Sequence, residues 1–287
     1  MNEILYGKKI VDSILEDVSA NIERLHKAQI FPGLVTVQVG EDPAAKAYLA
    51  SQMRSAEKLG IRSRLISLPE LASQSVVADT IEKLNQDPEI HGIMLHVPLP
   101  RHLDSQALQW KIDSRKDVEG VTPYNLGRLF IGKPVLAPCT ALSVVELIKS
   151  TGVKLRGKEV TMVGRSDIVG KPVALMLTKL DCTVTLCHQG TSEAEKLEEH
   201  VRRADILVVS VGRPNFVTGE WVKPGAIVID VGINSVDNKM VGDVEFETAV
   251  KKAGFITPVP GGVGGVTVAY LWKNLIEAVD MQMNREG

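Results

Sequence analysis

The spacing of apolar residues in the first half of the chain alternates between helical and strand-like patterns. Residues 8–28 carry apolar side chains at helical spacing, which predicts an amphipathic helix. Further helices are predicted at 43–59 and 73–86, and strands at 32–40, 61–68 and 91–100. Because the connections between these strands are long enough for parallel pairing, the first half should form an α/β layer structure.

The second half contains apolar runs that show no polar alternation. Two of them, 205–212 and 225–232, predict strands that are buried on both faces. Strands are also predicted at 158–164 and 182–188, helices at 170–180 and 193–203, and a final helix from residue 268. This pattern is typical of a doubly wound parallel sheet, as in Rossmann-like domains.

A change in character separates the halves. Residues 116–139 are rich in Gly and Pro and lack a long period, which predicts a boundary or a functional loop. A helix at 140–152, with Thr140 as its N-cap, then opens the second half. The sequence therefore predicts an α/β protein of two domains, 1–139 and 140–267, before its last helix.

Charge and cysteine content exclude several classes of protein. The 287 residues include 33 basic and 35 acidic side chains, a net charge of −2, which indicates no nucleic-acid or membrane partner. The three cysteines have no metal-ligand spacing and form no disulfide framework, and Cys187 is expected to be a core residue. No signal peptide and no membrane-spanning run are present, so we expect a cytoplasmic protein without a metal site.

A turn that joins a strand to a helix has the features of a nucleotide site. In "VGRSDIVGKP" (163–172), Gly164 allows a tight turn, Gly170 allows close packing, and the helix N-terminus offers free N–H groups to a phosphate. Arg165 suits a 2′-phosphate, which favours NADP over NAD. The spacing differs from G-x-G-x-x-G, so a glycine-containing turn without a ligand is the alternative. His188, after the next strand, is expected at a loop tip.

Motifs along nearly the whole chain resemble the bifunctional methylenetetrahydrofolate dehydrogenase/cyclohydrolase family. They are, in order, "VGEDPAAKAYLAS", "GIMLHVPLP", "KDVEGVTPYNLGRL", "PCTALSVVELI", "VGRSDIVGKP", "GAIVIDVGIN" and "PVPGGVGGVTVAYL". The resemblance implies a catalytic, folate-binding domain (1–139, completed by a C-terminal helix, 268–287) and a Rossmann-like NADP domain (140–267). It also implies a cleft between the domains that holds a folate substrate, and a homodimer.

The resemblance also implies site residues. Those expected to bind the substrate are Tyr48, Glu119, Pro260, Gly261, Gly262 and Val263. Those expected to bind the cofactor are Gly164, Arg165, Ser166, Ile168, Val169, Gly170, His188, Gly212, Ile233 and Thr267. Gly261, Gly262, Gly264 and Gly265 are expected to form a flexible loop.

The catalytic residues depart from the family pattern. Tyr48 and Gln52 lie four apart and share a helix face, but the family has lysine where this chain has Gln52. A glutamine of the family is His96 here, and its folate-binding aspartate is Glu119. Hydride transfer needs little acid–base catalysis by the protein, whereas cyclohydrolysis requires a side chain that titrates near neutrality. A carboxamide never titrates, while the imidazole of His96 does.

Three hypotheses follow for the function. The first is an NADP-dependent methylenetetrahydrofolate dehydrogenase whose cyclohydrolase activity is weak or lost. The second is a full bifunctional enzyme in which His96 compensates for the missing lysine, so that Tyr48, Gln52 and His96 form the catalytic set. The third is a folate- or nucleotide-binding paralogue with little catalysis or a shifted substrate, in which His96 is an ordinary histidine at a strand end.

Overall fold

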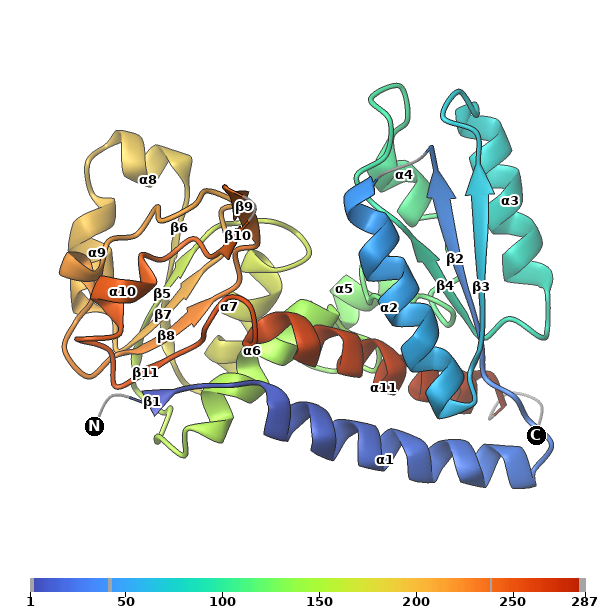
Figure 1. The fold of residues 1–287 in the computed structure, drawn as a ribbon, viewed down its shortest axis with the longest axis horizontal. Coiled ribbons are helices and arrows are strands. Elements are labelled where there is room, and N and C mark those ends of the chain that lie inside the picture. Colours follow the sequence, from blue (N-terminus) through green and yellow to red (C-terminus); the bar gives the residue numbers. More distant parts are fainter. Residues whose placement is uncertain (1–2, 41–42, 238, 284–287) are drawn as a thin grey trace. The chain divides into compact units, whose positions relative to one another are not determined.

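The computed structural model describes residues 3–40, 43–237 and 239–283, apart from the side chains of residues 43–48 and 51. The chain forms two compact α/β units, whose elements Figure 1 shows. One unit comprises Pro138–Tyr270 and the first residues up to Ser13; the other comprises Ile14–Ala137 and the chain from Leu271 onward. Two α/β units with a parallel sheet confirm the predicted fold class. The domain boundary at residue 139 stays a prediction.

The unit that contains Pro138–Tyr270 is built on a six-stranded parallel sheet, with the order β1-β11-β8-β7-β5-β6. The strands are β1 (Glu3–Ile4), β5 (Glu159–Val163), β6 (Thr183–Cys187), β7 (Ile206–Val209), β8 (Ile227–Asp230) and β11 (Phe255–Ile256). The other elements are α6 (Cys139–Ser150), α7 (Gly170–Lys179), α8 (Gln189–Glu193), α9 (Leu197–Arg203), η1 (Gly219–Trp221), β9 (Asn234–Val236), β10 (Lys239–Val241) and α10 (Phe246–Ala249). Strand β1 pairs with β11, so the first residues of the chain belong with its second half.

Apolar side chains on both faces of the sheet explain why its central parallel strands are buried on both sides. Every residue of β7 and β8 is buried, as expected of runs without polar alternation. The Cys187 side chain is fully buried in one core cluster, as predicted, and burial raises the pKa of its thiol. Strand order reverses at β5, which has β6 on one side and β7 on the other. Sheets of this kind bind nucleotides at such a switch point.

The other unit is built on a three-stranded parallel sheet in the order β3-β2-β4. Its elements are β2 (Gly33–Val39), α2 (Pro43–Leu59), β3 (Arg62–Leu68), α3 (Gln74–Gln86), β4 (Gly92–Leu95), α4 (Ser105–Gln109) and α5 (Pro123–Phe130). Buried side chains of α3 pack on one face of the sheet with Val35, Val37 and Ile93. Helix α2 lies beside the same sheet in Figure 1, and its residues line a pocket together with Gln38, which is on the face of β2 that α3 leaves free.

Two long helices complete the units, α1 (Lys8–Lys27) and α11 (Val263–Met283). From Leu271 onward, α11 belongs with the three-stranded sheet. The Trp272 indole donates to the Ser55 hydroxyl at 3.1 Å, and the Asn274 amide donates to the carbonyls of Val118 and Ala137 at 2.8 and 2.9 Å. The first bond holds the last helix to α2, and the buried bonds of Asn274 hold it to Val118, next to Glu119, and to Ala137. Within the described residues, no helix is long and apolar enough to cross a membrane.

Some predicted elements are wrong in detail. The segment 116–139 contains helix α5, which begins at Pro123, because proline suits a first helical turn. Helix α6 begins at Cys139, so Thr140 is a helical residue and not the N-cap. The predicted helix 193–203 is divided between α8 and α9, with Glu195 at a positive φ between them. Gly264 and Gly265 lie in α11 and not in a loop, because the helix begins at Val263.

Candidate functional site

The turn between β5 and α7 requires glycine at two positions. Gly164 has a φ of +122°, and a Cβ there would lie 2.1 Å from the Ser210 carbonyl oxygen. A Cβ on Gly170 would lie 2.2 Å from the carbonyl oxygen of Gly164. Gly164 therefore allows the turn to approach Ser210, directly after β7, and Gly170 allows α7 to begin in close contact with the turn. This is the backbone arrangement that a nucleotide phosphate needs.

Residues inside this turn have different roles. The Ser166 hydroxyl accepts from the N–H groups of Val169 and Gly170 at 3.2 and 3.3 Å, so it caps the start of α7. Arg165 and Ile168 are exposed. The turn thus presents the Arg165 guanidinium to solvent, whereas the N–H groups of Val169, Gly170 and Lys171 donate to the hydroxyl and carbonyl of Ser166.

A pocket of about 470 Å³ adjoins this turn. Its lining includes Gly164 and Arg165 from the turn, His188 after β6, and Val211 and Arg213 after β7. The His188 side chain accepts from the N–H of Gly190 at 3.2 Å, so it caps the short helix α8 while it lines the pocket. The structure therefore brings together three of the predicted cofactor-binding residues, Gly164, Arg165 and His188.

Gly212 lies next to this pocket but does not line it. Its N–H donates to the Asp243 carboxylate at 3.0 Å, so this backbone donor is not available to a phosphate. The sequence did not single out Asp243 or Arg213, although the turn-like triplet "VGD" (241–243) is present in the chain. A buried aspartate is uncommon enough that only the structure reveals its partners.

A second pocket, of about 210 Å³, lies at the carboxyl end of β8. Its lining includes Ile233 and the predicted substrate residues Pro260, Gly261, Gly262 and Val263. Thr267 does not line it; the Thr267 hydroxyl donates to the Val263 carbonyl inside α11, at 3.2 Å. Ile233 is 67% exposed, so an apolar side chain is available to a flat ring at this place.

The same pocket has one buried carboxylate in its wall, that of Asp230. Its oxygens accept from the N–H groups of Gly232, Asp243 and Val244 at 3.0, 2.9 and 2.8 Å. Burial raises the pKa of Asp230 to about 6, and the three N–H groups oppose that rise. Asp230 therefore fixes the chain around the pocket.

The predicted catalytic residues belong to the three-stranded unit. Gln52 is 3% exposed, and its amide donates to the Met94 sulfur at 3.7 Å. His96 directly follows β4, and its backbone N–H donates to the Val37 carbonyl at 2.8 Å. Gln52 therefore contacts β4, the strand that directly precedes His96. Tyr48 belongs to α2, but its side chain lies outside the described residues.

Glu119 lies at the same end of the sheet. Asp117 pairs with Ile93 of β4, which places Glu119 near the carboxyl end of that strand. Oε2 of Glu119 and Oδ1 of Asp117 are both closed off from solvent and have no hydrogen-bond partner among the described residues, while Oδ2 of Asp117 accepts from the Thr122 N–H and the Asn125 amide at 2.7 and 2.8 Å. Burial, together with the charge of Asp117, raises the pKa of Glu119 to about 8. A carboxyl group in this state is neutral near neutral pH.

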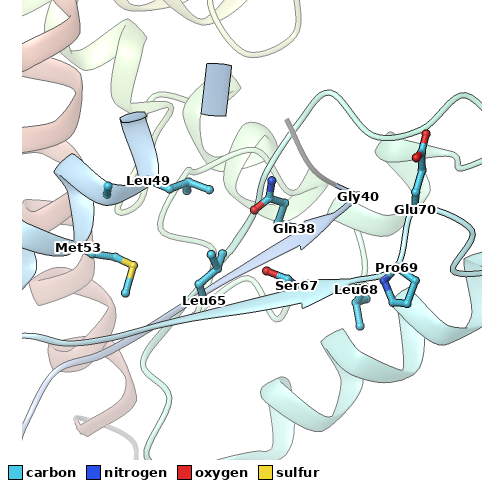
Figure 2. Close-up of a pocket in the computed structure, with 10 residues that line it drawn as sticks. Gln38, Gly40, Leu49, Met53, Leu65, Ser67, Leu68, Pro69 and Glu70 are labelled. Carbon is cyan, nitrogen blue, oxygen red and sulfur yellow. The ribbon is translucent and has the colours of Figure 1, made fainter. Parts of the chain in front are cut away.

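A third cavity, of about 580 Å³, lies between α2 and the edge of the same sheet. Figure 2 shows Leu49 and Met53 from α2 opposite Gln38 of β2 and Leu65 of β3. Among the predicted site residues whose side chains the structure describes, none lines it. Its lining is mostly apolar, and α2, the helix that carries Gln52, forms one of its walls.

Comparison with known proteins covers both units. Residues 5–119 match the tetrahydrofolate dehydrogenase/cyclohydrolase catalytic domain, and residues 138–283 match the NAD(P)-binding domain of the same family. A relative from Acetivibrio thermocellus, the bifunctional protein FolD, is 46% identical over 281 residues, which is 98% of each chain.

Solved structures are similar over the same length. The bifunctional FolD enzyme of Campylobacter jejuni has a TM-score of 0.93 and 38% identity, over 97% of this chain and 99% of that one. The Trypanosoma brucei enzyme, solved with NADP and an inhibitor, has a TM-score of 0.92 and 36% identity, over 98% of both chains. Both sequence and fold thus agree over the whole length, and the chain belongs to the tetrahydrofolate dehydrogenase/cyclohydrolase family.

Proposed function

We propose that this chain is a bifunctional enzyme, which oxidises 5,10-methylenetetrahydrofolate with NADP and then hydrolyses the methenyl product. The supporting observation is 46% identity over 98% of both chains to a relative named as bifunctional, with matches to both domains of the family. This evidence favours the second hypothesis from the sequence over a loss of cyclohydrolase.

The residues of the six-stranded unit fit NADP. A Cβ on Gly164 or Gly170 would overlap backbone atoms, so glycine at both positions keeps the turn compact. Helix α7 begins at Gly170. We infer that the pyrophosphate binds at this turn and that Arg165 binds the 2′-phosphate. The nicotinamide supplies the hydride acceptor, and Ile233 with the segment from Pro260 to Val263 would hold its ring.

For the oxidation, the protein mainly has to hold two carbon atoms in contact. The nitrogen lone pair next to the methylene bridge expels the hydride, so no side chain needs to titrate in this step. Glu119 is suited to accept an N–H of the folate ring, because its Oε2 has no hydrogen-bond partner among the residues that the structure describes. The replacement of lysine by Gln52 is therefore compatible with the dehydrogenase reaction.

For the hydrolysis, water adds to the methenyl carbon and a proton must leave it before the ring opens. Gln52 can hold that water by a hydrogen bond but cannot take its proton. We infer that the His96 imidazole takes this proton and returns one to the ring nitrogen as the carbon–nitrogen bond breaks, while the remaining hydroxyl proton leaves to solvent as the formyl carbonyl forms.

A dehydrogenase with weak or no cyclohydrolase is the second candidate function. It is favoured by Gln52, whose buried amide is directed to the Met94 sulfur. Two separate assays with the purified protein distinguish the candidates. Reduction of NADP by methylenetetrahydrofolate tests the first activity, and the loss of supplied methenyltetrahydrofolate tests the second. Faster loss than in buffer supports the bifunctional enzyme; loss at the buffer rate supports the second candidate.

A further inference from the structure

The 470 Å³ pocket next to the β5–α7 turn is lined by two arginines. Arg165 follows β5 and Arg213 follows β7, and these two strands are neighbours in the sheet. Within the part of the chain that the structure describes, neither guanidinium pairs with a carboxylate. The acidic residue of the lining, Glu193, accepts from the Gln189 amide at 2.6 Å. The pocket thus has an excess of positive charge.

The turn that carries Arg213 is held by a buried carboxylate. Asp243 is fully buried, and it accepts from three successive N–H groups, those of Val211, Gly212 and Arg213, at 2.6, 3.0 and 2.8 Å. It also accepts from the Asn234 amide at 2.9 Å. With four donors, this carboxylate is well satisfied in spite of its burial.

These hydrogen bonds have a consequence for ligand recognition. Because Asp243 occupies the three N–H groups, the backbone of the turn cannot use them to bind an anion. The Arg213 side chain remains available, and its guanidinium lies over the Phe216 ring, 4.6 Å from the ring centre. Stacking of this kind limits the positions of an otherwise exposed side chain at the pocket.

We propose that Arg213 is a specificity-determining residue, whose guanidinium binds the adenosine 2′-phosphate of NADP together with Arg165, and that Asp243 is its positioning residue. This rests on the proposed use of NADP. A 2′-phosphate carries close to two negative charges, which two arginines match, whereas NAD has a neutral hydroxyl at that place. Arg213 therefore adds to the affinity for NADP and not to that for NAD.

The direct test is calorimetric binding of two fragments, 2′,5′-ADP and 5′-AMP, to the intact protein. Arg213→Gln should weaken 2′,5′-ADP binding by about tenfold and change 5′-AMP binding by less than about twofold. Arg156→Gln is the matched control, because Arg156 is exposed in the same unit, outside the pocket, and pairs with Asp181 at 3.6 Å. Equal weakening of both fragments, or no change of either, overturns the role of Arg213.

Two further variants test the positioning. Asp243→Asn places an amide against the N–H groups of the turn and should reduce the preference for 2′,5′-ADP over 5′-AMP. Phe216→Leu leaves those hydrogen bonds in place and removes the aromatic face, so it should reduce the preference by a smaller factor even if the Asp243 variant does not fold. General damage would weaken the binding of both fragments equally, and that result in both variants contradicts the positioning role.

A wild-type protein that binds neither fragment nor NADP would instead refute the cofactor of the proposed function.

Discussion

The Gln52 amide donates to the Met94 sulfur at 3.7 Å, inside the three-stranded unit and next to the strand that ends at His96. A thioether is a weak acceptor, so this contact holds Gln52 only loosely. The position that is lysine in the family pattern is therefore occupied by a buried neutral amide, and its hydrogen bond to a described residue is this weak one. The same place could accept a lysine of similar length.

Gln52→Lys should increase the cyclohydrolase rate by at least about tenfold, because general acid–base catalysis typically contributes about a hundredfold or more. Burial would lower the pKa of the new ammonium toward neutrality. The measurement is the loss of methenyltetrahydrofolate in the presence of the variant. Gln52→Met, which fills the same space without a proton to exchange, is the matched control and should not increase the rate. An unchanged rate in the lysine variant would contradict a role for position 52 in the hydrolysis.

His96→Gln should lower the cyclohydrolase rate by about a hundredfold, since it removes the titrating imidazole and restores the glutamine of the family pattern. The dehydrogenase rate should fall by a much smaller factor. Both rates are measured on one preparation, so a loss of folded protein would lower them equally. Hydrolysis that continues at the wild-type rate would exclude the imidazole from the mechanism.

The Glu119 carboxyl should make the stability of the protein depend on pH. Its pKa in the folded chain, about 8, is above the ordinary value of 4.5, so between these values the native state holds a proton that the unfolded chain has lost. The free energy of unfolding should therefore fall as the pH rises through this window, by up to about 1.4 kcal/mol per pH unit.

Urea unfolding of the wild type and of Glu119→Gln measures this effect. The wild type should lose stability relative to the variant as the pH rises toward 8, because the variant has no carboxyl to ionise. Asp230, with a pKa raised to about 6, adds a slope of its own in the lower part of the window, and the comparison removes it because both proteins contain Asp230. Parallel curves for the two proteins would show that Glu119 is not protonated in the folded state.

Gly164→Ala should destabilise the protein by roughly 2–5 kcal/mol, because a strained φ is combined with overlap between the new Cβ and the Ser210 carbonyl. Gly225→Ala is the control: Gly225 also has a positive φ, of +82°, but a Cβ there meets nothing within 4 Å. That variant should lose only about 1–2 kcal/mol. Equal losses in urea unfolding would show that the close approach to Ser210 is not what requires glycine.

Much of the fold could be predicted from the sequence, since the patterns were local. The unbroken apolar runs that became β7 and β8 predicted buried parallel strands, and the glycines of the β5–α7 turn predicted a nucleotide site. The helix that begins at Pro123 was missed because it is short and lies in a segment that is rich in Gly and Pro. The role of Asp243 could not be predicted, because its partners lie about 30 residues away along the chain. Only the folded structure shows that Oε2 of Glu119 has no hydrogen-bond partner among the described residues, because burial and neighbours cannot be read from the local sequence.

The most direct test of the bifunctional enzyme follows three species in one reaction of purified protein, methylenetetrahydrofolate and NADP. The account predicts that reduced NADP accumulates while methenyltetrahydrofolate stays at a small fraction of it, with 10-formyltetrahydrofolate as the remainder. Methenyltetrahydrofolate that accumulates in step with reduced NADP, and decays only as fast as in buffer, would contradict it.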